Sequence, residues 1–144
     1  MSIRDNVLTA VVTALNTDRP GNVPAARRRR FSAMETASLP VIDVAPVKEH
    51  VAPVGGRAGP LVKRSLEFVV RVWTSGDAPE IKADVAAAWA TKALANNRLG
   101  GLVHDIEEMG TEWQARPMDS VFGATEIHFL AQYQTKTTDQ EATA

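Results

Sequence analysis

The sequence predicts an α+β fold, with a mainly antiparallel sheet and two main helices packed on one face. In residues 61–73, apolar and polar side chains alternate with a period of two, which is typical of a strand with one face in a core. An alanine-rich amphipathic stretch follows at about residues 78–99. The short turn between them folds this predicted helix back onto the strand. We expect the other elements to extend this sheet or to add a helix at its edge.

The helix after the central strand has a recognisable start. Asp77 is a suitable N-cap, Pro79 lies in the first turn, and Glu80 stands three residues after the cap, as in a capping box. Apolar spacing predicts a buried helix face that contains Ile81, Val85, Ala88 and Trp89. We expect the helix to stop at Gly100 and Gly101, and one of these glycines to have a positive φ.

The first part of the chain predicts a helix, a loop, an arginine-rich strand and a second strand. Residues 2–15 carry one apolar stripe at helical spacing, and residues 16–24 are a loop rich in Asn, Asp, Pro and Gly. The second strand covers residues 38–47, with Pro40 and Pro46 expected at its ends or facing outward. Residues 48–60 are rich in Gly and Pro and predict a mobile loop.

The last third of the chain predicts two further strands. Residues 107–116 form an irregular strand with a bulge or turn at Gly110, and residues 117–120 form a turn. Residues 121–135 alternate again and form the closing strand. We therefore expect a single domain over residues 1–135. Residues 136–144 contain no large apolar side chain and predict a disordered tail.

Composition excludes several classes of function. The chain has 144 residues, a net charge of −1 and no cysteine, so it has no disulfide, no thiolate ligand and no global field that attracts nucleic acid or anionic lipid. No signal peptide and no apolar run of membrane-spanning length is evident, which predicts a soluble protein that does not contact a membrane.

Residue chemistry indicates no active site, so we expect no enzyme and no cofactor. The histidines, His50, His104 and His128, do not have the spacing of a helical metal site. His104 and Asp105 could form an acid–base pair, but no nucleophile accompanies them. A cation could bind the glutamates at 107, 108 and 112, although a solvated strand edge explains them better. The three tryptophans are better explained as core or subunit-contact anchors than as stacking platforms.

The basic run of residues 27–30 has two interpretations. It could be a cationic patch for a phosphate backbone or an acidic partner. It could also be an edge strand whose charges discourage pairing, which we favour because no aromatic residues are interleaved. On a strand, Arg28 and Arg30 share one side and Arg27 and Arg29 the other. The segment Gly55, Gly56 and Arg57 resembles a phosphate loop only superficially, because the Gly-Lys-Ser/Thr ending is absent.

The order of these features resembles the tail terminator family, the U-type minor tail proteins of long-tailed bacteriophages. The resemblance covers about residues 3–135. It is carried by the Leu-Pro-Val-Ile-Asp-Val segment at 39–44, the Leu-x-Phe-x-Val-x-Val strand at 66–72 and the Leu-Gly-Gly-Leu-Val-His-Asp-Ile segment at 99–106. The Glu-Trp pair at 112–113 and the Tyr-Gln-Thr ending at 133–135 complete it. The same order of features is also compatible with other head–tail joining or tail-completion proteins.

The resemblance implies a structural virion protein that forms a homohexameric ring. Such a ring sits on the head-proximal end of the tail tube, stops elongation and presents a docking surface to the head-completion or neck protein. Genomic DNA would pass through the lumen without sequence-specific recognition, and assembly would take place in the host cytoplasm. The candidate interface residues are Arg27, Arg28, Arg29, Arg30, Gly55, Gly56, Arg57 and Arg116. The alternative from a different class is a small nucleic-acid or anion-binding module that uses the four adjacent arginines.

Overall fold

The computed structural model describes residues 2–28, 40–53, 61–75, 79–116, 122–136 and 139–143. Its elements in chain order are α1 (Ile3–Asn16), β1 (Ala26–Arg28), β2 (Val41–Pro53), β3 (Leu61–Ser75), α2 (Pro79–Leu94), the short 3₁₀ helix η3 (Leu99–Gly101), β4 (Asp105–Arg116), β5 (Phe122–Lys136) and β6 (Asp139–Thr143).

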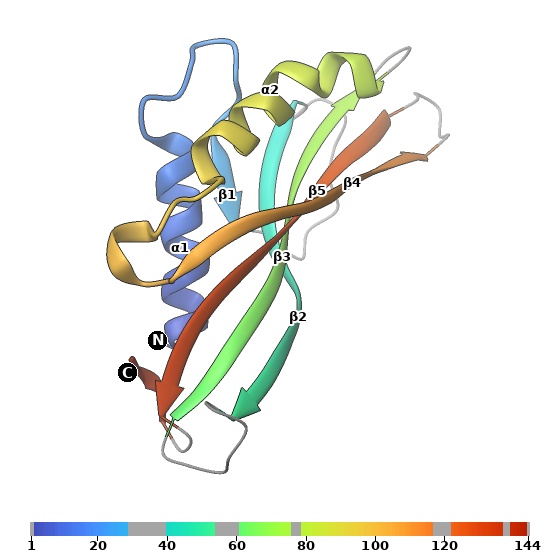
Figure 1. Ribbon diagram of the computed structural model, residues 1–144. Coiled ribbons are helices and arrows are strands. Elements are labelled where there is room, and N and C mark those ends of the chain that lie inside the picture. The colour runs from blue at the N-terminus through green and yellow to red at the C-terminus, as the bar shows by residue number, and fades with distance from the viewer. Residues whose placement is uncertain are drawn as a thin grey trace.

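The strands form one twisted sheet in the order β1-β2-β3-β5-β4, and β6 pairs with the end of β5 (Figure 1). β1 runs parallel to β2, and every other described pair is antiparallel. Both α-helices lie on the same side of the sheet, where they share one apolar core with it. The predicted α+β fold class is confirmed.

The core forms where alternate residues of β3 and β5 meet the two helices. Leu66, Phe68, Val70 and Val72 are buried on β3, as their period of two predicts. Phe68 lies directly opposite Phe129 on β5, and their rings stack with centroids 5.5 Å apart. The predicted core faces of both long strands are therefore confirmed.

The first helix also matches its prediction. The Ser2 hydroxyl oxygen accepts a hydrogen bond from the Asp5 backbone N–H at 3.1 Å, which caps the helix. The predicted apolar stripe packs into the core, and its buried members are Ile3, Val7, Leu8, Val11 and Leu15.

The buried face of α2 differs from the prediction. Its innermost residues are Ala83, Ala86, Ala90 and Leu94. Val85 is 53% exposed, Ala88 is exposed, and Trp89 is half-buried with its indole N–H donating to the Leu15 carbonyl at 2.9 Å. The prediction placed the larger side chains on the buried face, but the face that packs against the sheet consists mainly of alanines. Asp77 lies outside the described residues. Glu80 and Ile81 belong to α2, but the structure does not describe their side chains.

The end of α2 also comes earlier than predicted. The helix stops at Leu94, and Asn96 has a φ of 59°, a left-handed conformation that asparagine tolerates well. Gly100 and Gly101 do have positive φ values, 69° and 97°, so that part of the prediction is confirmed. They shape the turn of η3 that leads into β4, rather than ending the helix.

Strand β2 extends further than predicted, because residues 48–53 continue the ladder with β3 rather than forming a loop. The register shifts between Pro46 and Lys48, so Val47 forms a bulge. Pro46 therefore lies inside the strand beside the bulge. After the bulge the facing of the side chains is exchanged, which places Glu49 opposite Leu66 on the core face. The rest of the predicted loop, residues 54–60, lies outside the described residues.

The C-terminal segment also differs from the prediction. Residues 139–143 form β6, paired with β5 through Thr135 with Thr143 and Lys136 with Asp139, so the prediction of a disordered tail is wrong for these residues.

The irregular strand with a bulge near Gly110 is confirmed as β4. Within the described ranges, no helix has both the length and the apolar character needed to cross a membrane.

Candidate functional site

The sheet face opposite the helices carries a row of charged side chains. Asp43, Arg71, Glu126 and Glu112 are paired in register across β2, β3, β5 and β4. Each of these strands contributes one residue. All four side chains point away from the core because side chains alternate between the two faces along each strand. The row brings together four charges that are far apart in the sequence.

The centre of this row is unusually buried for a polar face. Asp43 is 4% exposed and Glu126 is 8% exposed. Arg71 links them: its Nε donates to Asp43 Oδ1 at 3.0 Å, and its Nη1 lies 3.8 Å from Glu126 Oε2. The guanidinium group also lies over the Trp73 ring, 5.9 Å from its centroid. Arg71 thus offsets much of the cost of desolvating the two carboxylates.

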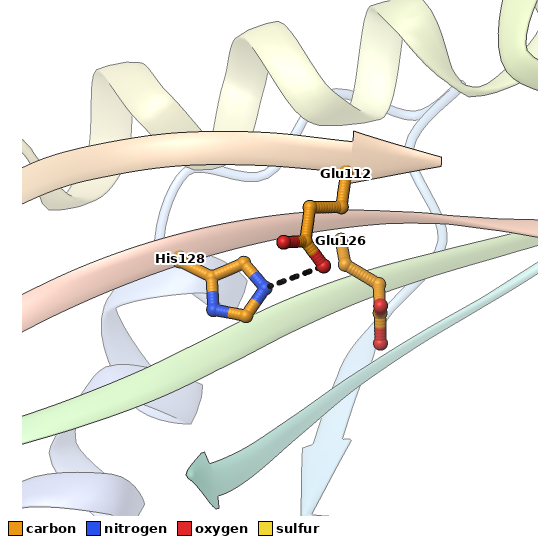
Figure 2. A group of neighbouring side chains, drawn as sticks. All are labelled: Glu112, Glu126 and His128. Atoms are coloured by element: carbon orange, nitrogen blue, oxygen red, sulfur yellow. Dashed lines mark ion pairs between the residues drawn. The ribbon is translucent and has the colours of Figure 1, made fainter. Parts of the chain in front are cut away.

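His128 stands between two further carboxylates. Its Nδ1 is 3.1 Å from Glu67 Oε2, and its Nε2 is 3.7 Å from Glu112 Oε2 (Figure 2). Glu112, Glu126 and His128 each place one ligand-type atom within 4.8 Å of the others. Figure 2 shows the Glu112 carboxylate directed at the imidazole ring, while Glu126 extends from the same strand as His128.

An open depression of about 290 Å³ lies at this position. It is lined by Glu67, Met109, Gly110, Thr111, Glu112 and His128. In the strand register Gly110 is the partner of His128, and a Cβ built on this glycine would have no atom within 4 Å. The bulge of β4 therefore leaves open space beside the imidazole ring, whose side chain is 20% exposed although its Nε2 atom is buried.

The outer edge of β4 is the second notable surface. Among the described strands, β4 pairs only with β5 and so ends the sheet. Two large apolar side chains on it face solvent: Met109 is 53% exposed and Trp113 is 62% exposed. Glu107, Glu108 and Glu112 are also exposed, so this edge is acidic with two apolar anchors.

The structure separates the interface residues predicted from the sequence. Arg27 and Arg28 lie on β1 at the edge of the described sheet opposite β4, which confirms the prediction of an edge strand for these two residues. Arg27 is exposed, and Arg28 Nη2 is 3.8 Å from Asp5 Oδ1. Arg116 is the last residue of β4. Arg29, Arg30, Gly55, Gly56 and Arg57, together with residues 117–120, lie outside the described residues.

Reasoning from the sequence did not connect His128 with Glu112 and Glu126. The alternation of β5 does place Glu126 and His128 on the same face, two residues apart. Their approach to Glu112 depends on the register between β4 and β5 and on the bulge at Met109, which no local pattern determines. His104 and Asp105, the pair that the sequence did bring together, are both exposed.

Comparisons with models of protein families and with curated proteins found no match to this chain. The assignment to the tail terminator family therefore stays a prediction that rests on the sequence features above.

Proposed function

We propose that the protein is a structural subunit that assembles into a closed ring, and that this ring is the tail terminator of a long-tailed bacteriophage. The observation that carries the proposal is the outer edge of β4. Trp113 shares a sheet face with Ile106, yet Ile106 is completely buried while Trp113 is 62% exposed. A large aromatic side chain left open on an unpaired strand edge is typical of an interface anchor.

The two ends of the sheet have opposite charge. β4 carries exposed glutamates, and β1, at the far end, carries Arg27 and Arg28. A contact between the acidic edge of one copy and the basic edge of the next is heterologous. Repeated contacts of this kind close into a ring if the rotation between copies is suitable. Opposite charge on the two edges favours this head-to-tail contact over contacts between like edges.

The contact at β1 is expected to use side chains rather than a continuous ladder. The backbone N–H of Ala26 donates to Asn16 Oδ1 at 2.8 Å, and Asn16 Nδ2 donates to the Ala26 carbonyl at 3.0 Å. The side chain of Asn16 thus occupies both backbone groups of Ala26, so an incoming strand cannot pair with this residue.

The resemblance supplies the sixfold number and the biological place. The ring binds the head-proximal end of the tail tube, stops elongation and receives the head-completion or neck protein. The phage genome passes through its lumen, and the ring belongs to the virion after assembly in the host cytoplasm. This assignment rests on the order of sequence features described above.

The test is the oligomeric state of the purified chain, measured by light scattering and by negative-stain microscopy with and without tail tubes. We expect sixfold rings. Trp113→Ser should weaken ring formation. Val85→Ser is the matched control, because Val85 is similarly exposed but lies on α2, and it should assemble like the wild type. Chains that form no ring under either condition would reject the proposal.

A second measurement distinguishes a terminator from other neck proteins. In lysates of a phage that lacks this protein, we expect unjoined heads and tails of irregular length. Tails of uniform length would assign the protein to a later joining step instead.

A further inference from the structure

We propose that Glu112, Glu126 and His128 form a binding site for a divalent transition-metal ion such as Zn²⁺. The proposal does not depend on the ring. It rests on the geometry of His128, on the local charge and on the open depression beside the imidazole ring.

The hydrogen bonding of His128 leaves one ring nitrogen available as a ligand. Glu67 Oε2 lies 3.1 Å from Nδ1, a contact in which a neutral imidazole carries its proton on Nδ1. Nε2 then presents a lone pair. This Nε2 atom is buried, has no hydrogen-bond partner among the described residues, and lies 3.7 Å from a carboxylate oxygen of Glu112. Two acceptors that face each other are stabilised by a cation between them.

Glu67 orients the imidazole ring of His128. Metal-binding histidines commonly donate their other ring N–H to a carboxylate, which fixes the tautomer and makes the ligand nitrogen more basic. Glu67 holds this position, and its side chain is only 13% exposed. It lies on β3, next to the strand of His128, so the sheet itself fixes the orientation of the imidazole ring.

The local charge around His128 also favours a cation. The ion-paired group on this face contains four carboxylates, Asp43, Glu67, Glu112 and Glu126, and two basic side chains, Lys48 and Arg71. With His128 neutral, these six charged residues have a net charge of −2, which a divalent cation would neutralise. Arg71 is already shared between Asp43 and Glu126, and Lys48 is 76% exposed and 4.0 Å from Glu67.

The ligand set indicates the class of ion. One imidazole and two carboxylates suit Zn²⁺ and its first-row neighbours, whereas Mg²⁺ and Ca²⁺ prefer oxygen ligands only. Glu112 has a 68% exposed side chain and can move toward the ion, while Glu126 and His128 are held by their neighbours on β3. The depression at Gly110 gives the ion a path from solvent and leaves room for water in the remaining coordination positions.

The test is calorimetric titration of the metal-free full chain with ZnCl₂, and separately with MgCl₂. We expect one Zn²⁺ per chain, a higher melting temperature with Zn²⁺, and no comparable effect of Mg²⁺. His128→Gln and Glu112→Gln should each weaken Zn²⁺ binding by about 10-fold or more. His104→Gln and Glu107→Gln are matched controls, because both residues are exposed and outside the cluster, and these variants should bind like the wild type.

A proton could occupy the space between Nε2 and Glu112 instead of a metal ion. Nitrogen-detected NMR of the imidazole groups distinguishes the proton from Zn²⁺. The chain has only three histidines, so their signals can be assigned with single variants. Zn²⁺ at the site would shift the Nε2 resonance of His128 and leave His50 and His104 unchanged. A doubly protonated His128 that Zn²⁺ does not perturb, or equal Zn²⁺ affinity in the wild type and in His128→Gln, would overturn the proposal.

Discussion

The ion pair between Arg64 and Glu49 gives the sharpest test of how this sheet is stabilised. Both residues lie on the core face, Arg64 through the alternation of β3 and Glu49 because of the bulge in β2, and their side chains are only 9% and 10% exposed. Arg64 Nη1 lies 2.8 Å from Glu49 Oε1, and Arg64 Nε donates to Thr135 Oγ1 at 2.8 Å. The Tyr133 hydroxyl donates to the other carboxylate oxygen of Glu49.

Replacing Arg64 by Met removes the main cation and leaves the Glu49 carboxylate buried. Breaking a buried pair in this way costs about 3–5 kcal/mol in the free energy of unfolding. Arg4 stays near Glu49, but at 3.7 Å and with a 41% exposed side chain it offsets only a small part of this loss. We therefore expect Arg64→Met to destabilise by about 3 kcal/mol.

The double variant Arg64→Met, Glu49→Gln should recover part of that loss. No buried charge is left, and the amide oxygen still accepts the hydrogen bond of Tyr133. Urea unfolding with linear extrapolation measures each free energy of unfolding, and Lys63→Met, an exposed position on the opposite face of β3, is the control. A loss below about 1 kcal/mol for Arg64→Met, or additive effects in the double variant, would refute this account.

Two further predictions concern Tyr133 and the core faces. Burial, followed by the hydrogen bond to Glu49, raises the pKa of Tyr133 above its ordinary value of 10.0. The unfolded chain therefore loses this proton first, so the contribution of Tyr133 to stability should be fully present below about pH 10 and fall as the pH rises further, and Tyr133→Phe should flatten the decline. Because Tyr133 is the only tyrosine, tyrosinate absorbance of the folded protein reports it directly, and an ordinary titration midpoint would contradict the prediction. Val70→Asp should lower the free energy of unfolding by several kcal/mol, because Val70 is completely buried. Val85→Asp, on the exposed face of α2, should change it by about 0.5 kcal/mol or less. Equal shifts of the melting temperature in the two variants would show that the two faces are misassigned.

The sequence by itself determined the fold class and the faces of the longest elements. Alternation over β3 and β5 separates Phe68 and Phe129 from Arg71 and His128, because successive side chains of a strand point to opposite sides. The spacing of the apolar residues in α1, with Ser2 before them, likewise predicts both the helix and its cap. These features are local, so they can be read without knowing what each element contacts.

The face of α2 was decided by packing. Its alanines provide little hydrophobic contrast around the helix, so the larger Val85 suggested the wrong buried side, whereas Trp89 does pack against the core while remaining partly exposed. The sheet surface, with large side chains such as Phe68 and Phe129, is instead covered by small residues such as Ala83 and Ala90. Complementarity of size between two packed surfaces is a property of the pair and cannot be read from the helix alone.

The charged sites depend on bulges and on strand register. The bulge at Val47 moves Glu49 to the core face, and the bulge near Met109 sets Gly110 opposite His128. One extra residue in a strand reverses which side chains face the core beyond it, and a neighbouring strand is needed to reveal the change. The sequence therefore supplied the glutamates and the histidine, and only the tertiary structure brought His128 between Glu67 and Glu112, because their contacts join strands that are distant in the chain.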